Sequence, residues 1–202
     1  MHRRRFIEIV AAGGLVGCAS PQRDLPASPD FVVENVGERL ITALPGSPMF
    51  WRIENLPTLV EAQAASQPTS LVAEVSGRVW LVTLGAQGER TPGAAFVAEI
   101  GPVPRVEADR YTLRLNHAHA PPGAATSVHT HPGSEAFYVL AGQLSQRTPH
   151  GTARVNAGET LNGHMPGMVM QLQSTATEPL DQLVLFVVDA EQAFSSPASF
   201  QH

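Results

Sequence analysis

Two histidines and a glutamate lie within seven residues of one another in the segment His129-Thr-His131-Pro-Gly-Ser-Glu135. Side chains alternate along an extended strand, so His129 and His131 are expected to point to the same face. A Pro-Gly pair then breaks the run. Glu135 opens a second apolar run, which we expect to fold back beside the first. Two imidazoles and one carboxylate on one face form the ligand set of a two-histidine, one-carboxylate metal site.

Glycines on either side of this segment complete a longer motif. Gly123 precedes His129 with five residues between them, and Gly142 follows Glu135 with six residues between them. With the His-x-His-x3-Glu core, this spacing resembles the first motif of the cupin superfamily at every defining position. The resemblance implies an all-β fold: a cupin barrel (a double-stranded β-helix or jelly roll) with His129, His131 and Glu135 holding a metal inside.

A second cupin motif, which supplies a fourth ligand in the family, is matched only in part by residues 158–174. Aligning Gly167 with the family's second glycine places Met170 where the family has histidine and Met165 where it has proline. Three interpretations of Met170 stay open. It is a thioether ligand, which favours copper; it is an apolar filler beside a three-ligand site; or the barrel holds no metal.

Other histidines offer further candidate ligands. His164 lies an even number of residues from Met170 and could supply the fourth ligand, with a solvated loop histidine as the alternative. His117 and His119 form another pair at the end of the run YTLRLNHAHA. They continue the face of the apolar residues before them. Either they line the barrel, or they are an ordinary pair at the end of a strand.

The N-terminal residues are expected to be an export signal. The segment Arg3-Arg4-Arg5-Phe6-Ile7 resembles a twin-arginine motif, and the apolar run after it is too short to span a membrane. The segment Leu15-Val16-Gly17-Cys18 resembles a bacterial lipoprotein box, which implies cleavage before Cys18 and lipid attachment to it. We therefore expect an exported protein, lipid-anchored through Cys18 on the periplasmic side of a bacterial membrane. The alternative is an ordinary signal peptide in which Cys18 is incidental.

Composition excludes several classes of chemistry. Cys18 is the only cysteine, so an intrachain disulfide is impossible. If Cys18 carries the lipid, no thiolate metal site or cysteine nucleophile is available to the mature domain. All 13 basic residues are arginine, which excludes a lysine Schiff base. Loss of residues 1–17 would leave 185 residues, enough for one domain with a substantial core. The formal charge would move from −5 to −7, and no basic stripe for nucleic-acid binding is visible.

The chain is predicted to divide into five regions. They are a signal peptide (1–17), a lipid-anchored tether (18–30), an N-terminal β extension (31–107), the cupin barrel (108–190) and a C-terminal tail (191–202). The extension is expected to add strands to the barrel's sheets, with a degenerate second barrel as the alternative. It should contain a short helix from Pro57 to Ala65 and a hairpin that turns at Ser76-Gly77.

The run LVLFVV near the end of the barrel is apolar on both faces. A strand of this kind is buried on both sides, so the sheet must be covered on its outside. The cover is predicted to be the N-terminal strands or a partner subunit. Because cupins commonly pair through such sheets, the resemblance also implies a homodimer.

Three protein ligands would leave open coordination positions on the metal. This arrangement favours iron or manganese, or copper if Met170 is a ligand. Phe137 and Val139 share the strand face of Glu135 and would give the metal an apolar wall. We expect a metal-dependent oxygenase or isomerase acting on a small oxygen-rich molecule. The alternative is a non-catalytic envelope protein that binds a metal or small ligand.

Overall fold

A computed structural model describes residues 24–201 of the chain. The expected signal peptide and the expected lipid attachment at Cys18 lie outside the described residues. The described part is an all-β protein with one short helix, in agreement with the predicted fold class. None of its helices is long and apolar enough to cross a bilayer.

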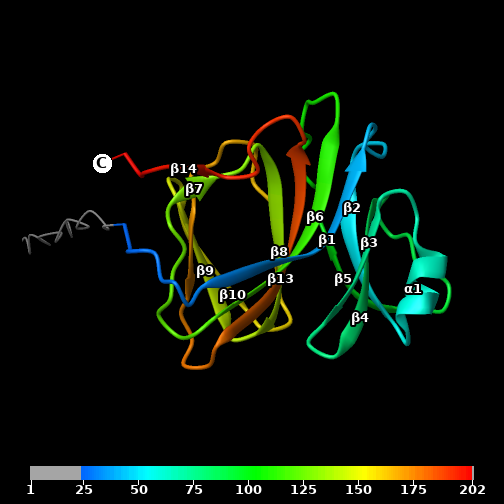
Figure 1. The fold of residues 1–202 in the computed structure, drawn as a ribbon, viewed down its shortest axis with the longest axis horizontal. Helices are drawn as coiled ribbons and strands as arrows, with labels where there is room; N and C mark the ends of the chain where they lie inside the picture. Colours follow the sequence, from blue (N-terminus) through cyan, green and yellow to red (C-terminus); the bar gives the residue numbers. More distant parts are fainter. Residues whose placement is uncertain (1–23, 202) are drawn as a thin grey trace, which may run out of the picture.

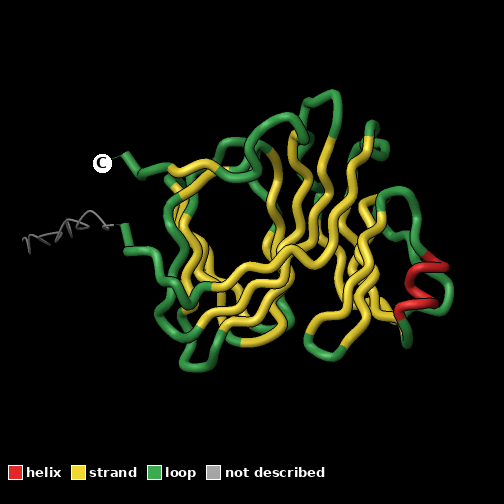
Figure 2. Tube along the Cα trace, viewed as in Figure 1, coloured by secondary structure: helices red, strands yellow, loops and turns green. Residues whose placement is uncertain are grey.

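Two antiparallel sheets curve around a common interior and form the barrel (Figures 1 and 2). The larger sheet has five strands in the order β1 (Val32–Ile41), β6 (Tyr111–Ala120), β13 (Leu180–Asp189), β8 (Gly133–Ala141) and β11 (Thr160–Leu161). The smaller sheet has three, in the order β10 (Gly151–Asn156), β9 (Gln143–Thr148) and β12 (Gln171–Ser174). A short ladder of β7 (His129–Thr130) with β14 (Ser196–Pro197) lies at one end of the barrel.

A second layer covers the outer face of the five-stranded sheet. It is a four-stranded sheet in the order β3 (Ser70–Val75), β4 (Arg78–Gly85), β2 (Phe50–Leu56) and β5 (Ala95–Ile100). Leu183, Leu185 and Val187 of β13 pack in one apolar cluster with Trp51 and Trp80 of this sheet. The alternate residues of β13 face the barrel interior. The prediction that N-terminal strands cover this sheet is therefore confirmed.

The extension adds strands in two different ways. Strand β1 joins the barrel's own sheet by pairing with β6, as expected. Strands β2 to β5 form a separate sheet that packs face to face with it, not a continuation of it or a closed second barrel. Strand β1 belongs to the barrel sheet although it precedes the covering sheet in the chain. The predicted boundary between extension and barrel at residues 107 and 108 stays a prediction.

The hairpin turn and the short helix predicted for the N-terminal extension are both present. The β3–β4 hairpin turns at Ser76 and Gly77, whose φ angles of 52° and 71° are those of a two-residue turn of the type that favours glycine. Helix α1 (Leu59–Ala65) begins after Thr58, which accepts a hydrogen bond from the backbone of Glu61 as an N-cap. Pro57 therefore precedes the cap and does not lie in the first helical turn.

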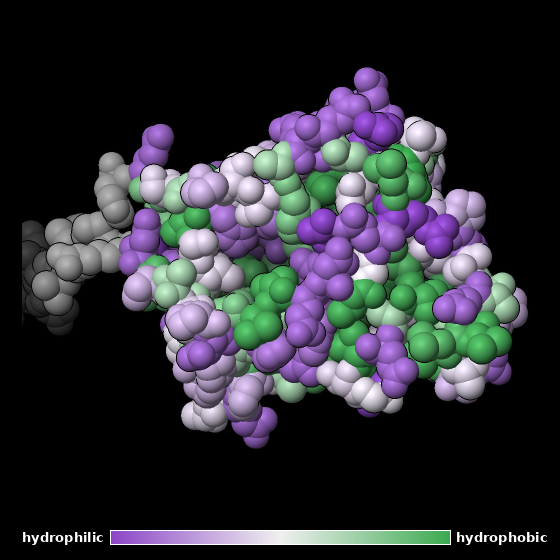
Figure 3. Space-filling view, in the orientation of Figure 1, coloured by the Kyte–Doolittle hydropathy of each residue, from purple (hydrophilic) through white to green (hydrophobic). Residues whose placement is uncertain are grey.

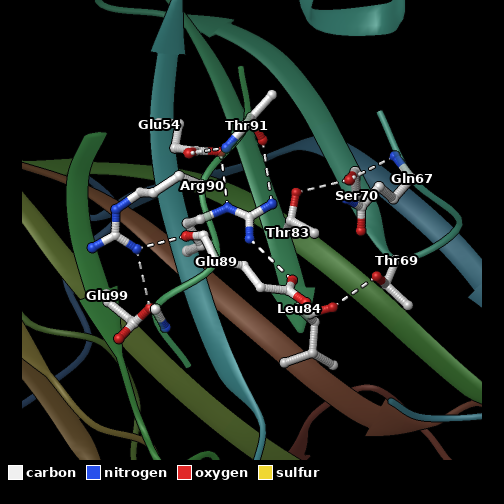
Figure 4. A network of polar contacts seen from close by, with 12 residues as sticks. Glu54, Gln67, Thr69, Ser70, Thr83, Leu84, Glu89, Arg90, Thr91 and Glu99 are labelled. Atoms are coloured by element: carbon white, nitrogen blue, oxygen red, sulfur yellow. Dashed lines mark hydrogen bonds and ion pairs between the residues drawn. The ribbon is translucent and has the colours of Figure 1, made fainter. Parts of the chain in front are cut away.

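A buried polar network lies on the face of the covering sheet opposite Trp51 and Ile53, which pack toward the barrel. Figure 4 shows its polar contacts. Arg52 of β2 bonds Glu54 at 2.9 Å, Glu89 at 3.2 Å and Thr91 at 3.2 Å. The backbone N–H of Thr91 donates to the second oxygen of Glu54 at 2.9 Å. Both Arg52 and Glu54 are buried, so every polar atom here depends on these partners.

The described part of the expected tether, residues 24–30, lies along the barrel. The Gln171 side chain bonds both backbone groups of Leu25, at 3.1 and 2.7 Å. The N–H of Ser28 donates to the carbonyl of Ala125 at 2.8 Å, and Asp24 pairs with Arg147 at 3.4 Å. These contacts attach residues 24–28 to the barrel. On the face drawn in Figure 3, hydrophobic residues form small groups separated by hydrophilic ones.

Candidate metal centre

The three predicted ligands lie on two neighbouring segments at one end of the barrel. His129 begins β7, and Glu135 lies near the start of β8. Strand β7 pairs with β14, and His129 also exchanges backbone hydrogen bonds of 3.0 and 2.9 Å with Met170. Strand β8 pairs with β13 and β11. The prediction that the Glu135 run folds back beside the histidine strand is therefore wrong, because each run pairs with a distant segment.

Gly133 allows the turn between these two strands. A Cβ at this position would overlap the backbone carbonyl of Val187 on β13. Only a residue without a side chain lets β8 approach β13 so closely at its first residue. The glycine thus sets the position of Glu135, two residues further along the strand.

The structure brings His129, His131 and Glu135 together. One ligand atom from each lies within 4.8 Å of the others, and no other such group of histidine, cysteine or carboxylate side chains occurs in residues 24–201. The Nε2 atom of His131 is 4.0 Å from a carboxylate oxygen of Glu135. His131 and Glu135 are buried, and His129 is half-buried. This is the size and composition expected of a three-ligand transition-metal site.

Backbone carbonyls orient both imidazole rings. Nδ1 of His129 bonds the carbonyl of Ser127 at 2.8 Å, and Nδ1 of His131 bonds the carbonyl of Phe194 at 2.6 Å. A carbonyl can only accept, so Nδ1 carries the proton in each ring and Nε2 keeps its lone pair. Burial lowers the pKa of both histidines, that of His131 to about 4. Both rings are therefore neutral at pH 7, which is the form that binds a metal.

Glu135 is a buried carboxyl group without a protein partner. It is 2% exposed, and its Oε2 atom has no hydrogen bond. Burial raises its pKa to about 8 in the metal-free protein. The 4.0 Å contact with His131 is therefore not an ion pair at pH 7, because both groups are neutral. A bound cation would supply the missing partner, so the residues present fit a metal.

In the metal-free protein, we expect the free energy of unfolding to fall between pH 6.5 and 8. Folded Glu135 keeps a proton here that the unfolded chain has released, since its ordinary pKa is 4.5. Stability falls with rising pH wherever the folded state binds more protons, by up to about 1.4 kcal/mol per pH unit. His131 has the opposite effect, because its pKa is lower in the folded protein than in the unfolded chain, but that effect is confined to pH values below about 6.5. Urea unfolding of chelator-treated wild type and Glu135→Gln tests it; equal pH slopes would contradict it.

A cavity of about 240 Å³ adjoins the three side chains inside the barrel. Its walls are mostly apolar, from Phe31 and Val33 at the N-terminal end of the barrel to Phe186 and Phe194 near the ligands. Apart from the three candidate ligands, no side chain of the lining titrates near neutral pH. Phe137 and Val139 belong to the apolar cluster of the barrel interior, on the strand face that they share with Glu135. They do not line this cavity, so the apolar wall expected from them is supplied by other residues.

The two candidates for a fourth ligand are both held by Gln146. Met170 is buried, and its sulfur accepts a hydrogen bond from the Gln146 amide at 3.6 Å. The other end of that amide bonds Nε2 of His164 at 2.6 Å. His164 lies outside the group formed by His129, His131 and Glu135. These contacts favour Met170 as an apolar filler that also receives the Gln146 amide.

We predict that Met170→Leu keeps the metal content of the wild type and changes metal affinity by less than about tenfold. Leucine has a similar volume, and the volume-conserving swap removes only the weak bond from Gln146. Metal analysis of the purified variant measures the result, with His164→Ala as a parallel test of the second candidate. Loss of metal from either variant would identify that residue as the fourth ligand.

His117 and His119 do not line the barrel. They lie on the face of β6 that carries Leu113 and Leu115, and that face packs against the covering sheet. Nε2 of His117 bonds Asp181 of β13 at 2.6 Å, and His119 is exposed. The interpretation as a pair at a strand end is therefore the correct one. The barrel interior receives the other face of β6, with Asn116 and Ala118.

No local sequence pattern identified several residues that build the site. The segment expected to be a C-terminal tail supplies Phe194, whose carbonyl orients His131 and whose ring centroid lies 4.9 Å from that of His131. It also supplies β14, which pairs with β7. The guanidinium group of Arg114 lies over the Phe194 ring, with its carbon atom Cζ 3.8 Å from the ring centroid. These residues are far from the motif in the chain, so only the fold brings them to it.

No family model matches the sequence, and no curated protein matches it. Parts of the chain are similar to solved structures. The DMSP lyase DddQ from Ruegeria pomeroyi is 26% identical over 43% of each chain, with a TM-score of 0.38. A double-stranded β-helix protein from Klebsiella pneumoniae is 24% identical over 44% of this chain and 76% of its own, with a TM-score of 0.38. A cupin 2 barrel protein from Salinispora arenicola is 18% identical over 39% and 65%, with a TM-score of 0.35.

The chain thus spans less than half the length of the lyase. The all-β fold class, a barrel with extra N-terminal strands, rests on the strand order and register of the chain itself.

Proposed function

We propose that the barrel holds a divalent transition metal, iron or manganese, through His129, His131 and Glu135, and that a small organic molecule binds beside it in the cavity. The observation that carries this proposal is the unpartnered Oε2 atom of buried Glu135, which lies among two imidazoles with free Nε2 atoms. A buried carboxyl group without a partner is costly, and a metal shared with two histidines offsets that cost.

The chain's own residues would orient the ligands of this centre and shape the space beside it. The carbonyls of Ser127 and Phe194 hold the two rings in the metal-binding tautomer. The apolar lining excludes water and accepts the hydrocarbon part of the ligand. A metal held by His129, His131 and Glu135 would keep open positions for the oxygen atoms of a ligand, and it would supply O2 activation or polarisation of a carbonyl.

Among enzymes, an oxygenase fits the lining better than an isomerase does. An isomerase that moves protons requires a general base within hydrogen-bonding reach of the substrate. Of the residues that line the cavity, only the three candidate ligands could accept a proton near neutral pH. The same lining also fits the second candidate function, a non-catalytic protein that captures a small ligand through the metal.

The location and assembly of the protein are proposed from the sequence alone. An exported protein anchored through Cys18 would carry its lipid six residues before Asp24, which is attached to the barrel by Arg147. This short connection would keep the barrel close to the membrane surface. A homodimer remains part of the proposal, although the covering sheet already occupies the outer face of the barrel on which the expectation was based.

The test is metal analysis of the protein, followed by oxygen uptake with small aromatic and hydroxy-acid substrates. Equimolar iron or manganese with metal-dependent oxygen uptake would support the oxygenase. Equimolar metal with ligand binding and no turnover would support the capture protein instead. A protein that binds neither metal after reconstitution would overturn both.

A further inference from the structure

A second polar group faces the same cavity and has no partner. Asn116 of β6 lines the cavity together with the three candidate ligands and is 4% exposed. Its Oδ1 atom is buried and forms no hydrogen bond with the protein. Its neighbours on the same face of β6, Ala118 and Ala120, belong to the apolar interior. Thr126, Ser127 and Ser195 also line the cavity, but of the lining residues only Asn116 and Glu135 have a buried side-chain oxygen without a hydrogen bond.

The strand register places Asn116 away from the metal ligands. Val184 of β13 pairs with Asn116 on one side and with Phe137 on the other, while Phe186 pairs with Glu135. Asn116 is thus two strands from Glu135 and one interior row further along, which separates their backbones by roughly 10 Å or more. A ligand that reaches both groups must carry its two polar ends on opposite sides of an apolar body.

A buried amide oxygen without a partner destabilises the free protein. An apolar residue of the same size would remove that penalty, so the position is better explained by a ligand that supplies the missing donor. From this geometry we infer that Asn116 determines ligand specificity. The ligand class is a small apolar molecule with an oxygen head on the metal and a hydroxyl or amino donor at its far end. The inference rests on the proposed function of the metal centre.

The cavity volume fits one substituted ring. An engineered apolar cavity of about 150 Å³ binds benzene, and the volume here is about 240 Å³. Benzoate and its 3- and 4-hydroxy derivatives are therefore suitable probes. They share the carboxylate head and the ring, and they differ only in the donor that would reach Asn116.

The experiment compares manganese-loaded wild type with Asn116→Leu by calorimetric titration of these three probes. In wild type, we expect one hydroxybenzoate to bind at least about tenfold more tightly than benzoate, because it satisfies the amide oxygen. In Asn116→Leu, that advantage should disappear while benzoate affinity is retained. The free variant should also melt at a higher temperature than wild type, which a merely structural asparagine would not allow.

Gln182 provides a matched control. Its amide is also buried and unpartnered, but it does not line the cavity. Gln182→Leu should therefore keep the preference for the hydroxybenzoate. If wild type shows no such preference, or Asn116→Leu keeps it, the role of Asn116 is overturned while the metal centre stands. If benzoate fails to bind the manganese form, or binds equally well without metal, the proposed function itself fails.

Discussion

Glu135→Gln is expected to lower metal affinity by at least roughly 100-fold without unfolding the protein. Changes to groups that only support a ligand already cost 10- to 100-fold, and here the proposed ligand itself loses its charge. Glutamine has the shape of the protonated carboxyl group that burial favours in the metal-free protein. The barrel should therefore tolerate it. Equilibrium competition against a chelator of known affinity measures the change.

Glu178→Gln is the matched control for this prediction. It makes the same substitution at an exposed glutamate in the turn before β13, and it should leave metal binding unchanged. Circular dichroism confirms that both variants are folded. If Glu135→Gln keeps equimolar metal at wild-type affinity, the carboxylate is not a ligand and the site must be rebuilt around the two histidines.

Arg52→Met is expected to reduce the free energy of unfolding by about 3–5 kcal/mol, because it leaves Glu54 as an uncompensated charge in a buried site. Glu54 is 0% exposed and accepts two hydrogen bonds, one from the Arg52 side chain and one from the backbone N–H of Thr91. The loss also frees Glu89 and Thr91, which hold the loop over this face of the covering sheet. Urea denaturation of the metal-free protein measures the difference.

Two further variants separate charge from packing. Arg52→Met combined with Glu54→Gln removes both charges and should recover much of the stability, since replacing a whole buried pair is often close to neutral. Arg105→Met breaks the ion pair between Arg105 and Glu107, both exposed, and should cost no more than about 1 kcal/mol. A loss of similar size for Arg52→Met and Arg105→Met would show that the buried charge of Glu54 is not the cause.

The local part of the site could be predicted from the sequence. The alternation of side chains along an extended segment places His129 and His131 on one face, and the same rule places Phe137 and Val139 with Glu135. The apolar run of β13 indicated a cover on both faces, and the hairpin turn followed from Ser76 and Gly77. Each of these features depends on neighbours in the chain.

The remainder depends on pairing between distant strands. Which face of β6 turns inward is decided by the covering sheet, so Asn116 faces the cavity and His117 does not. The return of β8 to β13 rather than to β7 is a choice between partners that no local pattern encodes. The buried pair of Arg52 and Glu54 shows only an i, i+2 spacing on a strand, which is equally typical of a solvated face.

The carbonyl that fixes the His131 ring belongs to Phe194, 63 residues further along the chain, and the strand that closes over β7 follows it. During synthesis, the three ligands therefore leave the ribosome long before the segment that orients one of them. A growing chain would already expose His129, His131 and Glu135, but it could not hold them in the metal-binding arrangement. We therefore expect metal loading to require completion of the barrel, and a chain cut before residue 194 should lack the proposed centre even though its whole ligand motif is present.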